Sequence, residues 1–378
     1  MRILGFLVLC TSMGLTAAGP VLLMSFDGLA ATQFTARTMP RFWQLSRQGQ
    51  RGEGVPPAPC TTFNGHATLA TGCWPEHHGI VANGFLDPAT GPVNYGAQAQ
   101  YLDREPLWVA ATRSGVRAAV YHWPCATGPW QGVTPWRMEA FRKDTPDSAA
   151  LAFSEKALKE GAGLVMTYIS GTDLPGHRNG PGSAATRRQL AALDAAIAPW
   201  IRRMRAAHPG LRILLLADHG MASMGHGIAV LPLLAPGAKV VAHGGSAFAY
   251  LPGPLDPATA AQLTALGLHL WRREDVPASF HLAGNARMGN LVLEAPLGSW
   301  ISDAATPEGR SKEQEGRQGA HGYVSDHRAM HTWLVALGTG SRAPLPPVAL
   351  WDVAPTIAKW LDIHWAATPD GLPVAALN

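Results

Sequence analysis

Four short apolar runs, none of which alternates with polar residues, constrain the fold of this chain more than any other feature. They are Val21 to Phe26, Ala118 to Trp123, Leu164 to Ile169 and Ile213 to Ala217. Strands that are buried on both faces of a parallel sheet have this composition. Helical patterns lie between the runs, the clearest of them from about Ser183 to His208. The alternation predicts an α/β sandwich with a mostly parallel central sheet and helices on both faces.

Three aspartates stand at or just beyond the ends of these predicted strands. Asp27 follows the first run, Asp173 the third and Asp218 the fourth. In open α/β sheets, ligands bind at the carboxyl ends of the strands. We therefore expect the three carboxylates to converge at one edge of the sheet, although they are far apart in the chain.

Residues 222 to 320 differ from the rest because they are rich in turns with Gly and Pro. They hold a helix candidate after Pro257, a strand candidate at Gly289 to Glu294, and a charged stretch at Arg310 to Arg317 that we expect to be an exposed loop. Two further core elements follow, a strand at Thr332 to Leu337 and a helix around Val353 to Leu361. The pattern predicts one domain over residues 19 to 378, with an inserted lobe at about 222 to 320.

The first 18 residues hold one Arg, a short apolar stretch and small residues near Ala18, which is typical of a secretory signal peptide. We expect export, to a periplasm or out of the cell. No apolar run reaches the ~20 residues of a transmembrane helix, so none is expected in the mature chain. Cys60, Cys73 and Cys125 remain after cleavage, and the sequence does not choose which of them, if any, form a disulfide.

The net charge of +4 is not concentrated in any run of five or six basic residues. The densest basic group, Arg202, Arg203 and Arg205, ends a helical pattern, where cations suit the helix dipole. Binding of a polymeric nucleic acid is therefore not expected.

Two Asp and His pairs have the spacing of metal ligands. Asp173 precedes His177 by four residues in a stretch with Pro and Gly beyond a predicted strand, and Asp218 is adjacent to His219 at another strand end. Either pair alone could be only part of a turn. Carboxylate oxygens and imidazole nitrogens are ligands that Zn²⁺ takes in proteins. With Asp27 and with His321 in a late polar loop, the set suffices for two tetrahedral divalent ions, if a hydroxyl and a water or substrate complete the shells.

Thr62 is the candidate for that hydroxyl. Two divalent ions carry four positive charges and three Asp remove three, so one alkoxide balances the set. Thr62 stands at the start of a predicted helix, where backbone N–H groups and the dipole favour an anionic phosphate oxygen. The alternative, that Thr61 or Thr62 only caps the helix, leaves the metal ligands unexplained.

These segments together resemble the nucleotide pyrophosphatase/phosphodiesterase family of the alkaline phosphatase superfamily. The resemblance rests on Leu22 to Leu29, Thr61 to Gly72, Pro75 to Asn83, Tyr121 to Pro124, Tyr168 to His177, Asp218 to Met221, Arg287 to Asn290 and His321 to Tyr323. Two stretches depart from the family's pattern: Asn64-Gly65 replaces Pro-Asn, and Val324-Ser325 replaces Asp-Asn. These departures leave the ligand positions intact but bring the shape of the helix start into question.

The resemblance implies an alkaline-phosphatase-like fold, two zinc ions and a role for each site residue. One ion would be held by Asp173, His177 and His321, and the other by Asp27, Thr62, Asp218 and His219. Asn83 would bond a phosphate oxygen, and Phe63 and Tyr168 would form a slot for a base or another flat group. Thr62 would attack a small-molecule phosphodiester or nucleotide, and a water activated by the metals would hydrolyse the phospho-threonine.

Several alternatives stay open. A phosphomonoesterase or phosphonate hydrolase of the same superfamily would share the ligands. No Lys or Arg stands beside the motifs in the sequence to neutralise the extra negative charge of a phosphomonoester, which favours a diester. A metal-stabilised binding protein without catalysis would not need Thr62. A sulfatase would need Arg in place of His77 in Cys73-Trp-Pro-Glu-His77. His243-Gly-Gly-Ser246 is reminiscent of an esterase oxyanion loop, but the chain has no Gly-x-Ser-x-Gly elbow.

Overall fold

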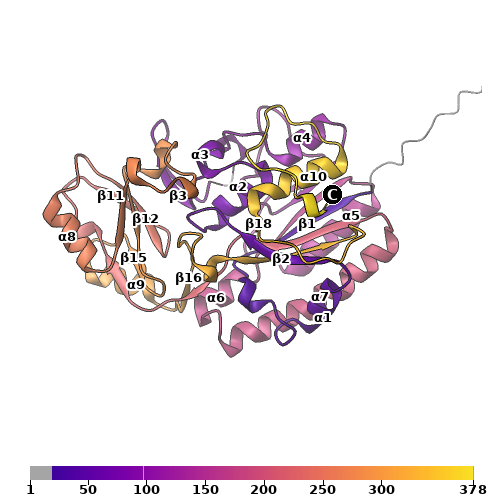
Figure 1. Ribbon diagram of the computed structural model, residues 1–378, viewed down its shortest axis with the longest axis horizontal. Helices are drawn as coiled ribbons and strands as arrows, with labels where there is room; N and C mark the ends of the chain where they lie inside the picture. Colours follow the sequence, from indigo (N-terminus) through magenta and orange to yellow (C-terminus); the bar gives the residue numbers. More distant parts are fainter. Residues whose placement is uncertain (1–18, 97, 378) are drawn as a thin grey trace, which may run out of the picture.

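The central sheet has eight strands in the order β18-β2-β17-β8-β1-β7-β5-β6. The computed structural model, shown in Figure 1, describes residues 19–96 and 98–377, so the predicted signal peptide lies outside the described residues. The strands are β1 Val21–Phe26, β2 Gln50–Val55, β5 Ala118–Tyr121, β6 Arg137–Glu139, β7 Leu164–Ile169, β8 Arg212–Ala217, β17 Thr332–Leu337 and β18 Val348–Ala349. The four strands predicted from apolar runs are parallel neighbours, and β17 runs antiparallel to β8 and β2. The predicted α/β fold is confirmed.

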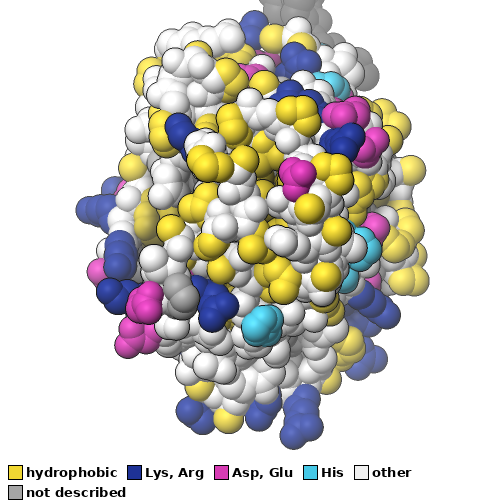
Figure 2. All heavy atoms as spheres, turned by 90° about the vertical axis from the view of Figure 1, so that its left-hand side faces the viewer, with side chains coloured by type: hydrophobic (Ala, Val, Ile, Leu, Met, Phe, Trp, Pro, Cys, Tyr) yellow, Lys and Arg dark blue, Asp and Glu magenta, His cyan; other side chains and the backbone are white. Residues whose placement is uncertain are grey.

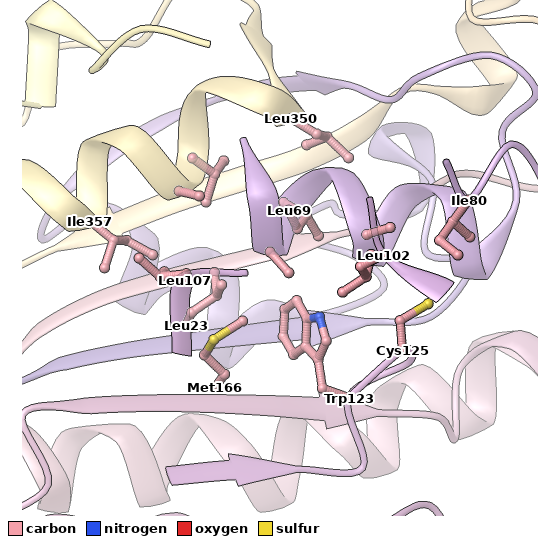
Figure 3. Packing of buried hydrophobic residues seen from close by; sticks show 14 of the residues in the cluster. Leu23, Leu69, Ile80, Leu102, Leu107, Trp123, Cys125, Met166, Leu350 and Ile357 are labelled. Carbon is pink, nitrogen blue, oxygen red and sulfur yellow. The ribbon is translucent and has the colours of Figure 1, made fainter. Parts of the chain in front are cut away.

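Helices cover both faces of this sheet, as Figure 1 shows. One face carries α1 Pro40–Ser46, α5 Asp147–Lys159 and α7 Ala184–Ala207, and the other α2 Thr62–Thr71, α4 Leu107–Arg113 and α10 Val353–Leu361. Alternate residues of β1 enter the two cores: Leu22 packs with the first set of helices and Leu23 with the second. Figure 3 shows the second core, where Leu69, Leu107 and Ile357 reach from three helices toward the sheet.

Most of the segment between β8 and β17 forms a smaller lobe at one end of the molecule (Figure 1). Its antiparallel sheet has the order β11-β12-β14-β13, and a separate apolar core lies inside it. The lobe elements are β9 Ala222–Ser223, β10 Gly227–Ala229, β11 Lys239–Ala242, β12 Ser246–Tyr250, α8 Pro257–Ala265, β13 His269–Arg272, β14 Leu291–Glu294, β15 Trp300–Ser302, α9 Pro307–Gln314 and β16 Gly319–Ala320. Hydrophobic side chains occupy much of the centre of its outer end, with charged ones toward the periphery (Figure 2).

The expectation of a loop at Arg310 to Arg317 is wrong, because α9 covers Pro307–Gln314. This helix is almost entirely polar, so it has no apolar stripe by which the sequence could reveal it. Its start does have an N-cap residue: the Thr306 side chain accepts a hydrogen bond from the backbone N–H of Gly309. No helix in the described part of the chain is long and apolar enough to cross a bilayer.

Arg287 ties the lobe to the body of the protein. Its Nε lies 2.7 Å from Oδ2 of Asp87, the last residue of β3 Gly84–Asp87. Its Nη1 donates to the carbonyl oxygens of Gly79 at 2.9 Å and Tyr101 at 3.1 Å, and to Asp103 at 3.0 Å. Loss of this guanidinium would leave several of these acceptors without a donor.

We expect Arg287→Ala to lower the free energy of unfolding by about 3 kcal/mol, because it leaves a largely buried carboxylate unpaired. Burial acts to raise the pKa of Asp87, but hydrogen bonds from Arg287, Thr90 and Ala89 lower it from 3.8 to about 2. A carboxyl group with a lowered pKa stabilises the fold above its unfolded pKa and ceases to do so as the pH falls through its folded pKa. The variant should therefore lose less stability than the wild type between pH 4 and pH 2. Urea unfolding across that range measures both effects.

Arg272→Ala is the matched control for this variant, because Arg272 is exposed and lies on the same lobe. It should change the free energy of unfolding by less than about 0.5 kcal/mol. Equal effects of the two substitutions would show that Arg287 does not fasten the lobe.

Candidate metal centre and nucleophile

The three central strands deliver the predicted aspartates to one edge of the sheet. Phe26 of β1 is in register with Ile169 of β7 and with Ala217 of β8, so these strands end level with one another. Asp27 and Asp218 follow directly. Asp173 begins α6 Asp173–Asn179 just beyond β7, and this helix places His177 one turn further on the same face.

The ligand candidates form two groups at this edge. Asp27, Asp218 and His219 each offer an atom within 4.8 Å of the others, and Asp173, His177 and His321 do the same. The groups are adjacent, because the rings of His219 and His321 stack with their centroids 4.0 Å apart. The structure thus brings together all six predicted Asp and His residues.

Hydrogen bonds orient each imidazole in the same way. In each ring Nδ1 lies near a backbone carbonyl oxygen. His177 Nδ1 is 2.8 Å from that of Gly319, His219 Nδ1 is 2.9 Å from that of Gly220, and His321 Nδ1 is 3.1 Å from that of Cys60. A carbonyl oxygen can only accept, so Nδ1 carries a proton in each ring and Nε2 is the nitrogen that remains for a metal ion. Burial, followed by the neighbouring His219 and His177, holds the pKa of His321 well below its ordinary value. Imidazoles whose Nδ1–H is fixed by a carbonyl oxygen are typical metal ligands through Nε2.

The carboxylates are compensated only in part. Burial acts to raise the pKa of Asp218, but His219 and His66 lower it below its ordinary value. Burial raises the pKa of Asp27 well above its ordinary value, and the charges of Asp218 and Asp173 raise it further. No Lys or Arg of residues 19–96 and 98–377 forms a salt bridge with any of the three. Asp173 Oδ1 and Asp218 Oδ2 are buried without a hydrogen-bond donor. Buried carboxylates in this arrangement are costly unless a cation neutralises them, so each group fits a divalent ion.

Thr62 lies beside the first group. Its Oγ1 is 3.4 Å from Oδ1 of Asp27 and 3.2 Å from Nε2 of His219. Thr62 is the first residue of α2, and the N-cap residue Thr61 makes no side-chain cap bond. Thr61 therefore occupies the N-cap position but does not cap the helix with its hydroxyl.

The unusual Asn64-Gly65 pair produces a regular start of α2. The Asn64 side-chain amide donates to the carbonyl oxygens of Ala58 at 3.2 Å and Pro59 at 2.9 Å. A Cβ on Gly65 would lie 2.8 Å from the backbone oxygen of Asp218, so glycine lets the helix approach the metal-ligand candidate Asp218 closely. His66, one turn after Thr62, lies with Nδ1 2.7 Å from the Thr62 carbonyl oxygen and 3.4 Å from Asp218 Oδ2.

The predicted substrate residues surround this helix start. Asn83 Oδ1 accepts a hydrogen bond from the Phe63 N–H at 2.9 Å, which leaves the Asn83 amino group as a donor. The Phe63 ring packs edge-on against Tyr95 at 5.6 Å. Tyr168 is buried, and its hydroxyl donates a hydrogen bond to Asp27 Oδ2. Sequence reasoning missed this bond, and the aromatic slot of Phe63 and Tyr168 stays a prediction.

Comparison with known proteins defines the class. The model of the family described as type I phosphodiesterase / nucleotide pyrophosphatase matches residues 21–324. The fold is alkaline-phosphatase-like: it matches murine ectonucleotide pyrophosphatase/phosphodiesterase 5, an inactive variant in complex with AMP, with a TM-score of 0.85 at 21% identity, over 95% of this chain and 99% of that one. This chain belongs to the type I phosphodiesterase / nucleotide pyrophosphatase family, whose members hydrolyse phosphodiester and pyrophosphate bonds.

Two curated relatives differ in how much of their length the chain spans. A pyrophosphatase/phosphodiesterase of Schizosaccharomyces pombe, itself named as uncharacterized, is 26% identical over 346 residues, which are 84% of this chain and 71% of the relative. The venom phosphodiesterase of Macrovipera lebetinus is 29% identical over 217 residues, 53% of this chain but only 25% of the venom enzyme. The chain therefore corresponds to one part of the longer relative.

Proposed function

We propose that this protein is a zinc-dependent hydrolase of small phosphodiesters or nucleotide pyrophosphates that works through a covalent phospho-threonine. The observation that carries the proposal is the position of Thr62 Oγ1, within 3.4 Å of Asp27 and His219 in the first of two adjacent groups of metal-ligand candidates. The oxygen and nitrogen donors suit zinc, with one ion for each group.

The candidate ligands form two sets, one for each ion. Asp27, Thr62, Asp218 and His219 would hold one ion, and Asp173, His177 and His321 the other. When bound, the ions favour the deprotonated threonine oxygen and neutralise the negative charge that develops on the phosphoryl group. Tyr168 keeps Asp27 in place by its hydrogen bond, and the backbone N–H of Gly28 does the same for Asp218 through Oδ1 at 3.1 Å.

The chain's own groups then account for the two steps. Thr62 Oγ1 forms a bond to phosphorus while the bond to the leaving oxygen breaks on the opposite side. The N-terminus of α2 and the free amino group of Asn83 donate hydrogen bonds to the phosphoryl oxygens. In the second step a water oxygen bonds to phosphorus, the bond to Thr62 Oγ1 breaks, and the threonine regains its proton.

Exposed apolar side chains favour a substrate with a flat organic group. Tyr95 beside Phe63 is 60% exposed, and Phe141, whose ring lies 6.3 Å from that of Tyr168, is 52% exposed. Leu174, next to Asp173, is 50% exposed. Aromatic side chains stack on nucleic-acid bases with about 1–3 kcal/mol for each base. We propose that a nucleoside or a similar group packs on the exposed side chains of Tyr95, Phe141 and Leu174.

A panel of p-nitrophenyl substrates tests the proposal. With bis(p-nitrophenyl) phosphate and the p-nitrophenyl ester of thymidine 5′-phosphate, we expect kcat/KM at least about tenfold above that for p-nitrophenyl phosphate. Among the described residues no Lys or Arg forms a salt bridge with the site carboxylates, and Arg317 acts on Asp173 without pairing with it, so little positive side-chain charge is placed to neutralise a monoester. A preference for the monoester, or for a p-nitrophenyl phosphonate ester, would favour the corresponding alternative. Turnover of none of them by the zinc-loaded protein would favour a binding protein.

Export is a separate proposal. It rests on the signal-peptide pattern of the first 18 residues, and on the relationship to enzymes named for venom. Fractionation of the producing cell tests it, and retention of the uncleaved chain in the cytoplasm would contradict it.

A further inference from the structure

The motif His243-Gly-Gly-Ser246 has no part in the hydrolase chemistry described above. In the structure, residues 243–245 form the turn between β11 and β12, on the lobe. This turn lies directly against the loop that carries the metal-ligand candidate His321. The N–H of Gly245 donates a hydrogen bond to the His321 carbonyl oxygen at 2.8 Å.

Glycines let the turn and the His321 loop approach this closely. A Cβ on Gly244 would lie 2.4 Å from the His321 carbonyl oxygen, and one on Gly322 would lie 1.8 Å from the His243 carbonyl oxygen. A Cβ on Gly245 would lie 2.2 Å from the ring of Tyr323. All three distances are below van der Waals contact, so a side chain at any of them would displace the loop.

The turn is itself fixed within the lobe. The Gly244 carbonyl oxygen accepts from the N–H of Ile301 at 2.7 Å, and that of Gly245 accepts from Ala295 at 2.8 Å. Tyr323 adds a second link, because its ring is fully buried and its hydroxyl donates to the Ser299 carbonyl oxygen at 2.5 Å. The main chain around His321 is therefore held by several parts of the lobe.

The same loop is bonded to the segment that precedes the nucleophile. Gly322 N–H donates to the Cys60 carbonyl oxygen at 2.8 Å, and Cys60 N–H donates to that of Tyr323 at 2.9 Å. His321 Nδ1 lies 3.1 Å from the Cys60 carbonyl oxygen as well. The His321 loop is thus placed between the lobe and the chain that leads to Thr62.

We infer that the lobe positions His321 for metal binding, and that Gly245 and Tyr323 are positioning residues for the Asp173, His177 and His321 group. The inference rests on the proposed metal-dependent function. Asp173 and His177 belong to α6, and Asp27, Asp218 and His219 follow the central strands. Only His321 among the six depends on the lobe turn for its main-chain position, so a disturbance of the turn should weaken one ion and spare the other.

Gly245→Ala in the full-length protein tests this, with Gly253→Ala as the matched control. Gly253 is also on the lobe, but a Cβ there would meet nothing within 4 Å. Zn²⁺ is titrated into the metal-free protein in competition with a chromophoric chelator. We expect one of two wild-type sites to weaken about 10- to 100-fold in Gly245→Ala, the other to change less than threefold, and Gly253→Ala to match the wild type.

Unchanged affinities in Gly245→Ala, or equal weakening of both sites, would overturn the inference while leaving the hydrolase proposal intact. A wild-type protein that binds no Zn²⁺ and hydrolyses no phosphodiester would overturn both.

Tyr323→Phe supplies a second variant in case Gly245→Ala does not fold. It removes only the hydroxyl that bonds Ser299, so we expect the same site to weaken about two- to tenfold. The melting temperature of each metal-free variant separates positioning from general stability. A lower melting temperature with an unchanged ratio of the two zinc affinities would show a merely structural role and contradict the inference.

Discussion

Thr62→Ala should lower kcat/KM for bis(p-nitrophenyl) phosphate by at least about 10⁴-fold, because it removes the oxygen that attacks phosphorus. The remaining residues still bind metal and substrate, so the variant should fold and keep its ligand groups. Thr62→Ser retains a hydroxyl at the same Cβ and should keep a substantial part of the activity. Steady-state kinetics on zinc-loaded protein measures all three forms.

Thr61→Ala is the matched control for this experiment. Thr61 is adjacent and fully buried, and its hydroxyl has no hydrogen-bond partner among the described residues. It should lower kcat/KM by less than about tenfold. Substantial turnover by Thr62→Ala, or an equal loss in Thr61→Ala, would contradict a nucleophilic role for Thr62. Acid quenching during turnover, followed by mass spectrometry, should find the phosphoryl group on the peptide that contains Thr62.

Removal of metal should have the second large effect. A chelator is expected to lower activity by more than about 100-fold, since even loss of a residue that supports a metal ligand costs 10- to 100-fold. It should also lower the melting temperature, because the carboxylates of Asp27, Asp173 and Asp218 lose the cations that neutralise them. Added Zn²⁺ should restore both properties.

Asp218→Asn separates metal binding from other effects of the chelator. Asp218 is fully buried, and Asn preserves its shape while removing the charge. The variant should resemble the chelated wild type in activity and respond poorly to added Zn²⁺. Full activity of the chelated wild type would contradict a metal-dependent mechanism.

The sequence predicted the central strands of the sheet but not β2, which lies near one edge. β1, β7 and β8 are apolar runs buried on both faces, and their composition alone reveals them. β2 reads Gln-Arg-Gly-Glu-Gly-Val and is partly exposed, so it carries no apolar run. Its place in the sheet depends on pairing with β17, which is remote in the chain. Local patterns cannot reveal such a strand.

Four of the metal-ligand candidates could be proposed from the sequence because they occur as local pairs. Asp218 and His219 are adjacent, and Asp173 and His177 are one helical turn apart. The groups that support them are remote: Tyr168 and Asp27 are 141 positions apart, and the Gly245 turn meets His321 only through the fold of the lobe. Their contacts follow from tertiary structure, which no spacing in the sequence encodes.

The most direct test of a two-ion centre beside Thr62 is the number of zinc ions per chain in protein of measured activity. Inductively coupled plasma mass spectrometry on dialysed protein should find two ions in the wild type and two in the inactive Thr62→Ala variant. Full phosphodiesterase activity in a protein that holds one zinc ion or none, and no other divalent metal, would contradict the account.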